Sequence, residues 1–409
     1  MKHNQLPSLL AMGIVFSGLM VGCSEVKDEE NSIVQESTQE TEESETINME
    51  EKEDNKKELV ESANNNISKN IALLDLAYKN ENIMISPTSL NIALGMITNG
   101  ASAETLAELE NYLECNIDEY NEFVKGYTEN QEEGVNVVNA VWVNENYKLK
   151  EDFYNLLIQY YNATHESLDF TNSESVNKIN NWVKENTDGR IEKVLNEIPG
   201  DTTTILTNVV DFDKKWEEPF EKLQIEEGKF NGEKDVTYLN DFVRCPYYEN
   251  DYATGFARYY EGGRYSFIGI LPKKEGEFNV SDLNIEELLE NGTMEKVDYK
   301  FPEFEFEFES SLKQYLKELG ITKAFNDNAD FSNLLEETEQ YYISEILQKT
   351  KIIVDREGTK ASAATSVIVA TNSAMENLPK QVYLDRPFVF VIYDNKTEEC
   401  LFIGKVVNP

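Results

Sequence analysis

Histidine and cysteine, the residue types on which nucleophilic triads and zinc sites most often depend, are scarce in this 409-residue sequence. It contains two histidines, His3 and His165, and four cysteines with no CxxC or CxxH spacing: Cys23, Cys115, Cys245 and Cys400. His3 lies in the N-terminal segment that we expect below to be removed as an export signal, so a Ser–His–Asp triad could only use His165 and a histidine-based metal site cannot be assembled. We therefore expect no enzymatic activity, no metal and no cofactor. We also expect a structural His165 and mostly buried free thiols, with one disulfide as the alternative.

One stretch does combine unusual residue types in a regular pattern. The segment Glu357–Met375, EGTKASAATSVIVATNSAM, is made almost entirely of small and β-branched residues. It follows Ile352–Val354, which has the composition of a strand end, and a loop pattern follows it. Val, Ile and Thr favour strands, and exposed segments of this kind tend to aggregate. The sequence thus carries a segment with strand composition at a position where a loop is expected.

Composition indicates a large acidic domain. The chain has 77 acidic and 37 basic residues, giving a formal net charge of −40, and 40% of its residues are hydrophobic. The length and apolar content suffice for a sizeable core. The charge excludes nucleic-acid binding through a basic surface.

The N-terminus has the pattern of an export signal. Residues 1–23 begin with a short polar stretch, continue with an apolar run from Leu9 to Val21, and end in LMVGC, which resembles a bacterial lipobox with Cys23 as the lipidated residue. A plain secretory signal with a coincidental Cys23 is the alternative. Residues 24–60 are acidic and almost free of large apolar residues, so we expect a disordered linker. These features predict a lipoprotein on the extracellular face of a bacterial cell membrane, or a secreted protein if the lipobox is not used.

The rest of the chain, residues 61–409, is expected to form one α+β domain without internal repeats. Helical spacing predicts helices over 67–79, 86–101, 102–113 and 173–195, the last broken at 187–189. Strand patterns occupy 135–144, 202–212, 265–273, 296–310, 349–355, 382–385, 387–394 and 400–407.

Six segments of this domain, in order, resemble the serpin family. They are NIMISPTSLNIALGMITNGASAETLAELENYL, VVNAVWVNENYKLKEDF, INNWVKENTDGRI, TILTNVVDFDKKWEEPF, ISEILQKTKIIVDREGTKASAAT and RPFVFVIYD with LFIGKVVNP. The resemblance implies a serpin fold of helices and three β-sheets with an exposed reactive-centre loop. In inhibitory serpins the loop is cut by the target protease and then inserts as a strand into the main sheet. The protease remains trapped as an acyl-enzyme.

The resemblance also assigns roles to individual residues. Counting the family's loop spacing from Arg356 places the reactive bond at Asn372–Ser373, with Thr371, Ala374 and Met375 as register alternatives. The hinge that enters the sheet comprises Glu357, Gly358, Thr359, Ala361, Ala363, Ala364 and Thr365. The sheet-opening region comprises Ser86, Ser89, Gln348 and Trp216. Two residues depart from the family pattern: Arg356 stands where an acid is usual, and Gln348 stands where a histidine is usual, so the control of sheet opening can differ here.

The hinge composition favours an inhibitor. Alternation along a strand places Thr359, Ala361, Ala363 and Thr365 on the inward face, and all four are small. No Arg, Lys or large aromatic residue lies near the reactive bond, so the expected partner is an elastase-like or subtilisin-like serine protease, bound covalently 1:1 by a monomer. An asparagine-specific cysteine protease is a lesser option. The alternatives are a non-inhibitory serpin acting as a surface binding module, and a purely structural lipoprotein.

Overall fold

The computed structural model describes residues 9–19, 67–337, 340–359 and 379–409. Its helices are α2 (Ile67–Ala77), α3 (Pro87–Thr98), α4 (Ala103–Leu113), α5 (Ile117–Glu129), α6 (Glu151–Tyr161), α7 (Ser173–Glu185), α8 (Ile285–Glu290) and α9 (Lys313–Glu318). Short 3₁₀ turns lie at η1 (Lys222–Gln224), η2 (Val280–Leu283) and η3 (Lys323–Phe325). No helix within these ranges is long and apolar enough to cross a membrane.

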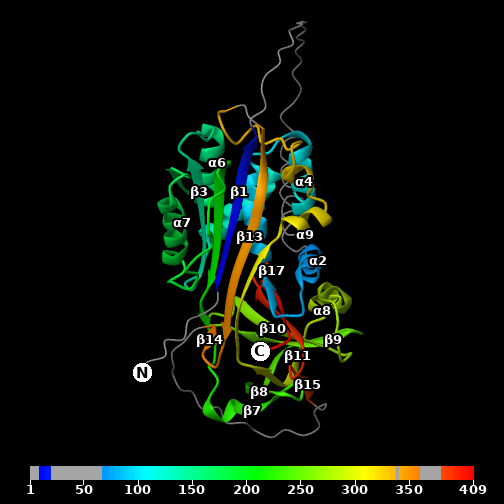
Figure 1. The fold of residues 1–409 in the computed structure, drawn as a ribbon. Helices are drawn as coiled ribbons and strands as arrows, with labels where there is room; N and C mark the ends of the chain where they lie inside the picture. Colours follow the sequence, from blue (N-terminus) through cyan, green and yellow to red (C-terminus); the bar gives the residue numbers. More distant parts are fainter. Residues whose placement is uncertain (1–8, 20–66, 338–339, 360–378) are drawn as a thin grey trace, which may run out of the picture.

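A six-stranded sheet, which we call the main sheet, forms one half of the molecule, with its long strands running up Figure 1. Its strand order is β12 (Phe304–Ser311), β13 (Gln340–Val354), β1 (Leu9–Leu19), β5 (Thr202–Phe212), β3 (Val135–Asn144) and β4 (Thr164–Leu168). All residues of β5 are buried, because helices cover both faces of the sheet at its centre.

A nine-stranded sheet occupies the other end of the molecule (Figure 1). Its order is β15 (Lys380–Tyr383), β11 (Thr293–Pro302), β8 (Lys234–Glu249), β9 (Ala253–Tyr259), β10 (Tyr265–Pro272), β16 (Phe388–Asp394), β17 (Glu399–Val406) and β2 (Ile83–Ile85), with β7 (Ile225–Phe230) beside β8. A third sheet has two short strands, β14 (Gly358–Thr359) and β6 (Lys214–Lys215).

Helix α3 lies in the core between the two large sheets. Every residue from Pro87 to Thr98 is buried, and the helix contacts both β5 and β17. Ser86 caps its N-terminus by accepting a hydrogen bond from the Ser89 N–H, and Pro87 fits the first turn because its missing N–H would have no helical partner. Helix α7 packs on the opposite face, where Ile179 joins Trp142 and Ile205 in a separate apolar cluster.

Several sequence predictions are confirmed in detail. Strands β3 and β5 have the predicted bounds, and α2, α3 and α4 begin and end within two or three residues of the predicted helices. The predicted helix over 173–195 is wrong beyond Glu185, where the chain turns through Gly189 at φ +80°. The single predicted strand over 296–310 is two strands, because Glu303 after Pro302 leaves β11 and the chain changes sheets.

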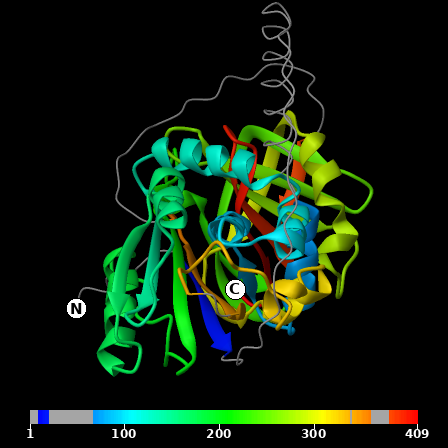
Figure 2. The ribbon, with the colours of Figure 1, turned by 90° about the horizontal axis from the view of Figure 1, so that it is seen from above.

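One strand of the main sheet comes from the apolar N-terminal run, for which no strand was predicted. Leu9–Leu19 forms β1, an eleven-residue strand in the centre of the main sheet, antiparallel to both β13 and β5. Seen from above, the dark-blue strand lies between a green strand and an orange strand (Figure 2). The apolar composition of this run indicates a signal-peptide core, and no local pattern predicts its pairing with the main sheet.

Candidate functional site

The hinge begins where β13 leaves the main sheet. The chain turns back within four residues, because Asp355 and Gly358 form an antiparallel bridge in which the Asp355 N–H donates to the Gly358 carbonyl at 3.1 Å. Gly358 has φ +146°, and a Cβ there would lie 2.5 Å from the Lys215 Cα, so only glycine fits. Thr359 then pairs with Lys214. The two described residues of β14 therefore already form a short ladder beyond the end of β5.

Trp216 holds the hinge turn through both its side chain and its backbone. Its indole Nε1–H donates to the Asp355 carbonyl at 2.8 Å, and its backbone N–H donates to the Glu357 carbonyl at 3.2 Å. The Phe220 N–H donates to the Arg356 carbonyl at 2.8 Å. Trp216 is 1% exposed and stacks on Tyr260 with ring centroids 4.5 Å apart. The buried, stacked ring of Trp216 thus holds the backbone of the turn in place.

The carboxyl group of Asp355 stabilises the same turn. It accepts a hydrogen bond from the Glu357 N–H at 2.8 Å. Burial raises its pKa above the ordinary range, and the nearby charge of Glu303 acts in the same direction. Arg356, which departs from the family pattern, forms an ion pair with Glu303 at 3.2 Å. The arginine therefore has a partner at the hinge and is compatible with a well-formed turn.

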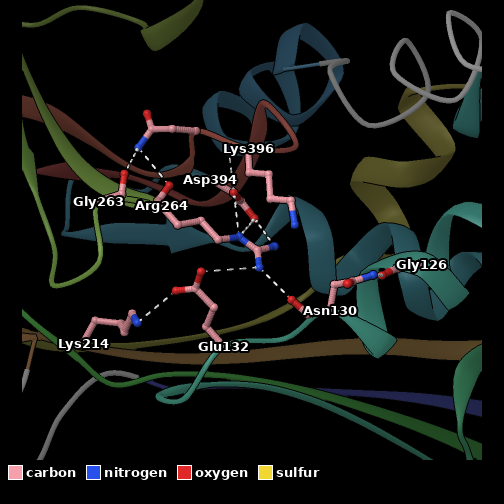
Figure 3. Close-up of polar contacts among 9 residues, drawn as sticks. Gly126, Asn130, Glu132, Lys214, Gly263, Arg264, Asp394 and Lys396 are labelled. Carbon is pink, nitrogen blue, oxygen red and sulfur yellow. Dashed lines mark hydrogen bonds and ion pairs between the residues drawn. The ribbon is translucent and has the colours of Figure 1, made fainter.

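A chain of ion pairs connects the hinge ladder to the core (Figure 3). Lys214, the partner of Thr359, lies 3.2 Å from Glu132, and Glu132 lies 4.0 Å from Arg264. Arg264 pairs with the buried Asp394 at 2.7 Å and donates to the Asn130 carbonyl at 2.7 Å. The contacts join the loop before β3, the loop before β10 and the end of β16. β6 is therefore linked by ion pairs to well-packed parts of the domain.

A second polar cluster lies under the middle of the main sheet. Gln348 on β13 donates from Nε2 to the Ser86 carbonyl at 3.3 Å, and the Ser89 hydroxyl donates to Asn208 Oδ1 on β5. Asn208 donates in turn to Asn139 Oδ1 on β3 at 2.8 Å. All five side chains are at most 1% exposed. The N-terminus of α3 is thereby tied to three strands of the sheet.

The sheet-opening residues are therefore divided between two places. Ser86, Ser89 and Gln348 converge as expected, and Gln348 takes part through hydrogen bonds in the position usual for histidine. Trp216 lies at the hinge, past the end of β5. The Cα partners of Met12 on β1 are Gln348 on one side and Asn208 on the other. The described β1 thus separates β13 from β5 at the level of the polar cluster.

The turn after α7 fastens that helix to the end of β5. The Gly189 N–H donates to the Lys184 carbonyl at 2.7 Å, as is usual for a glycine that ends a helix. The Arg190 side chain is 1% exposed and pairs with Asp211 at 2.5 Å and with Asp213 at 3.2 Å. The segment INNWVKENTDGRI therefore ends in a buried ion pair at the mouth of the gap that β1 fills.

The remaining predicted residues have clear places or lie outside the described residues. Cys115, Cys245 and Cys400 are buried free thiols, as expected. His165 lies on the edge strand β4, far from the hinge in strand order, and contacts Tyr154 edge-on. Desolvation lowers its pKa. The residues that lie outside are Cys23, Ala361, Ala363, Ala364, Thr365, Thr371, Asn372, Ser373, Ala374 and Met375.

Comparison with known proteins gives the family. The family model described as serpin (serine protease inhibitor) matches residues 62–409. The chain is a serpin. A serpin-like protein of Thermococcus kodakarensis is 33% identical over 355 residues, which cover 82% of each chain. The thermophilic serpin tengpin in its native state superposes with a TM-score of 0.75 at 35% identity, covering 85% of this chain and 94% of tengpin.

The same protein in its latent state also matches this serpin. The TM-score is 0.72 at 30% identity, with 86% of this chain and 98% of that chain covered. The fold of helices and three sheets is therefore that of the family, whose members are generally protease inhibitors without catalytic activity.

Sequence reasoning missed several residues that hold the site of this serpin together. Asn208 and Asn139 are buried polar residues inside apolar strands, and this interruption of the apolar pattern was the available signal. Asp355 and Lys214 could not be recognised from the sequence. Asp355 accepts the Trp216 hydrogen bond through its backbone carbonyl, and Lys214 contacts Thr359 and Glu132, which are distant from it in the sequence. Among the described residues, no group of three or more His, Cys, Asp or Glu side chains is placed to hold a metal ion.

Proposed function

We propose that this serpin is a suicide inhibitor that traps a serine protease as an acyl-enzyme, with its loop entering the main sheet after cleavage. The observation that carries the proposal is the direction of the hinge. β13 ends at Val354, the turn at Asp355–Gly358 reverses the chain, and Gly358–Thr359 pair beyond the end of β5. The chain therefore leaves the described hinge antiparallel to β13 and in line with the gap between β13 and β5.

The main sheet can also accommodate an extra strand at that gap. β1 makes ladders with both neighbours over most of its eleven residues, so β5 and β13 can separate by the width of one strand while the rest of the fold stays intact. A newly inserted strand gains two ladders of hydrogen bonds and buries its inward-facing side chains. The small residues at Thr359, Ala361, Ala363 and Thr365 suit such an insertion.

The target class follows from the residues around the proposed reactive bond, Asn372–Ser373. Val367–Thr371 are small or branched, which suits the shallow apolar pocket of an elastase-like or subtilisin-like enzyme. We further propose that Cys23 is lipidated and tethers the inhibitor to the outer face of a bacterial membrane. Incorporation of labelled palmitate into the wild-type chain, and its loss in Cys23→Ala, would support the anchor.

A matched pair of variants tests loop insertion. The processed inhibitor is mixed with an elastase-like protease and with a subtilisin-like protease, and the products are separated on a denaturing gel. We expect a band at the summed mass that survives boiling in SDS. Ala363→Arg places a long charged side chain on the inward face of the inserting strand, whereas Ala364→Arg places the same side chain on the opposite face, on the side of the partly exposed Lys349–Glu309 ion pair.

The two variants should differ sharply. We expect Ala364→Arg to form the complex and Ala363→Arg to be cut as an ordinary substrate. Mass spectrometry of the released C-terminal peptide then fixes the reactive bond. If the wild-type loop is cut without a covalent band and without a rise in melting temperature, the inhibitor proposal is wrong and a binding role takes its place.

A further inference from the structure

The position of β1 in the main sheet can be compared with the hinge residue by residue. Gly358 pairs with Lys215 and Thr359 pairs with Lys214, on the continuation of β5. Along the same antiparallel ladder, a strand continuing from Thr359 would bring residue 362 opposite Asp211. The Cα partner of Asp211 in the structure is Leu9, the first residue of β1.

The ladder along β13 predicts the same register for the inserted strand. Asp355 forms a bridge with Gly358 across the hinge turn. Continuing along β13 from that bridge would bring residue 362 opposite Lys351, and the Cα partner of Lys351 is again Leu9. Two independent ladders therefore agree that β1 lies in the register a strand continuing from β14 would need.

The two segments are also similar in composition over the shared positions. From Leu9 to Val15 the sequence is LLAMGIV, and in the corresponding register from 362 to 368 it is SAATSVI. Both runs lack charged residues and end in two β-branched residues, which suits a strand buried on both faces. The ladders of β1 shift register only after Val15.

The space between β5 and β13 can hold either β1 or the inserted loop, but not both. Neighbouring strands in a sheet lie about 4.8 Å apart, and β1 already pairs with both β5 and β13 over most of its length. We propose that Leu9–Leu19 acts as an intramolecular plug of the main sheet, so that the loop cannot insert while this segment remains attached and seated. The proposal rests on the proposed inhibitor function, because it concerns the gap that the cut loop would enter.

Removal of the export signal would also remove the strand that blocks the main sheet. Cleavage before Cys23 would remove residues 1–22 and β1 with them. β5 and β13 run parallel to each other, since β1 is antiparallel to both, so they can close the gap as a parallel pair until the loop needs it. The unprocessed chain is then inactive as an inhibitor, and the chain cleaved before Cys23 is able to trap its target.

Hydrogen exchange on the full chain tests whether the segment is seated. Cys23→Ala keeps residues 1–22 attached. In this background we expect amides of Leu9–Leu19 to exchange more than about 100-fold slower than those of the acidic segment 24–60, because they belong to a central sheet strand. Gly13→Pro removes an N–H and disrupts the central strand, whereas Gly22→Pro makes the same change outside β1. We expect protection to be lost in the first variant and kept in the second.

Loop insertion is then measured in the same chains. Each is cut in the loop with a subtilisin-like protease, and the melting temperature is compared before and after cleavage. We expect Gly13→Pro to gain stability and to form the SDS-resistant complex, and Gly22→Pro to do neither. Rapid exchange of Leu9–Leu19 in the Cys23→Ala chain would overturn the proposal, as would an equal gain in both proline variants.

The experiment distinguishes failure of the plug from failure of the inhibitor. If Leu9–Leu19 is protected in the Cys23→Ala chain but neither Gly13→Pro nor the processed chain gains stability on cleavage, the segment is seated and loop insertion is wrong. If Leu9–Leu19 is unprotected and all chains trap the protease, the inhibitor function stands and the plug is wrong.

Discussion

The indole N–H of Trp216 donates a hydrogen bond to the Asp355 carbonyl at 2.8 Å, and this contact ties the end of β5 to the turn that leaves β13. β5 and β13 are separated by β1 in the main sheet. The Trp216 contact lies past Asp211, the β5 residue that pairs with the first residue of β1. Trp216 therefore fixes the turn that connects β13 to β14.

Trp216→Phe should therefore loosen the hinge. The change removes the Nε1–H donor and part of the ring that stacks on Tyr260, and we expect the free energy of unfolding to fall by about 2 kcal/mol. Trp182→Phe on the half-buried face of α7 is the control. Urea denaturation gives the stability, and hydrogen exchange of Asp355–Thr359 gives the local effect. Equal exchange of that segment in the two variants would contradict the role assigned to Trp216.

Asn208→Ala should destabilise the middle of the main sheet. It leaves the Ser89 hydroxyl without its acceptor and Asn139 Oδ1 without its donor, both in fully buried positions, so we expect a loss of about 3 kcal/mol. Asn136→Ala, on the same sheet but exposed, should change stability by less than about 0.5 kcal/mol. Denaturant midpoints check both values. A loss below about 1 kcal/mol for Asn208→Ala would mean that the cluster contributes little.

Much of this fold could be predicted from local patterns, and the limits have physical causes. β3 and β5 are long apolar runs bounded by turn residues, so their bounds followed from composition. The change of sheet at Glu303 did have a signal, which the strand prediction missed: Phe301 and Phe304 are three residues apart, so the alternation changes phase at Pro302–Glu303 and one continuous strand could not bury both rings on the same face.

The site itself could be predicted only in part. Ser86 and Ser89 belong to a helix start that can be recognised from sequence, and their partner Gln348 came from the family resemblance. The pairing of Leu9–Leu19 with β5 depends on contacts across nearly 200 positions, which no local pattern encodes. A central strand and a signal-peptide core share the same apolar composition, so periodicity cannot separate them.

Arg190→Ala should strongly destabilise the attachment of α7. Asp211 is 2% exposed, and removing Arg190 leaves its carboxylate buried beside a gap that must accept a strand. Breaking a buried ion pair in this way costs about 3–5 kcal/mol. Lys193→Ala, on the exposed surface of the following loop, should be close to neutral. Thermal denaturation of the two variants compares them directly, and a melting temperature for Arg190→Ala equal to that of Lys193→Ala would show that the buried ion pair contributes little to stability.

Glu399 should make this serpin less stable as the pH rises. Glu399 is 1% exposed, and the Thr397 side chain lies close enough to hydrogen-bond with its carboxyl group. Burial raises its pKa well above the ordinary value, the charge of Asp394 raises it further, and Arg264 opposes both. Tyr120 and Tyr127 also face the carboxyl group, and its charge contributes to raising their pKa values.

The sign of the pH effect follows from this direction. Above the ordinary pKa of about 4.5 the unfolded chain releases the proton while the folded chain keeps it, so the free energy of unfolding decreases with rising pH until the folded pKa is reached. Glu399→Gln removes this dependence. We expect its stability advantage over wild type to grow by about 1.4 kcal/mol per pH unit across that window. Glu398→Gln, an exposed neighbour, is the control. Urea denaturation at several pH values between about 4.5 and 8 measures the slope, and parallel profiles for wild type and Glu399→Gln would show that Glu399 is ionised in the folded protein.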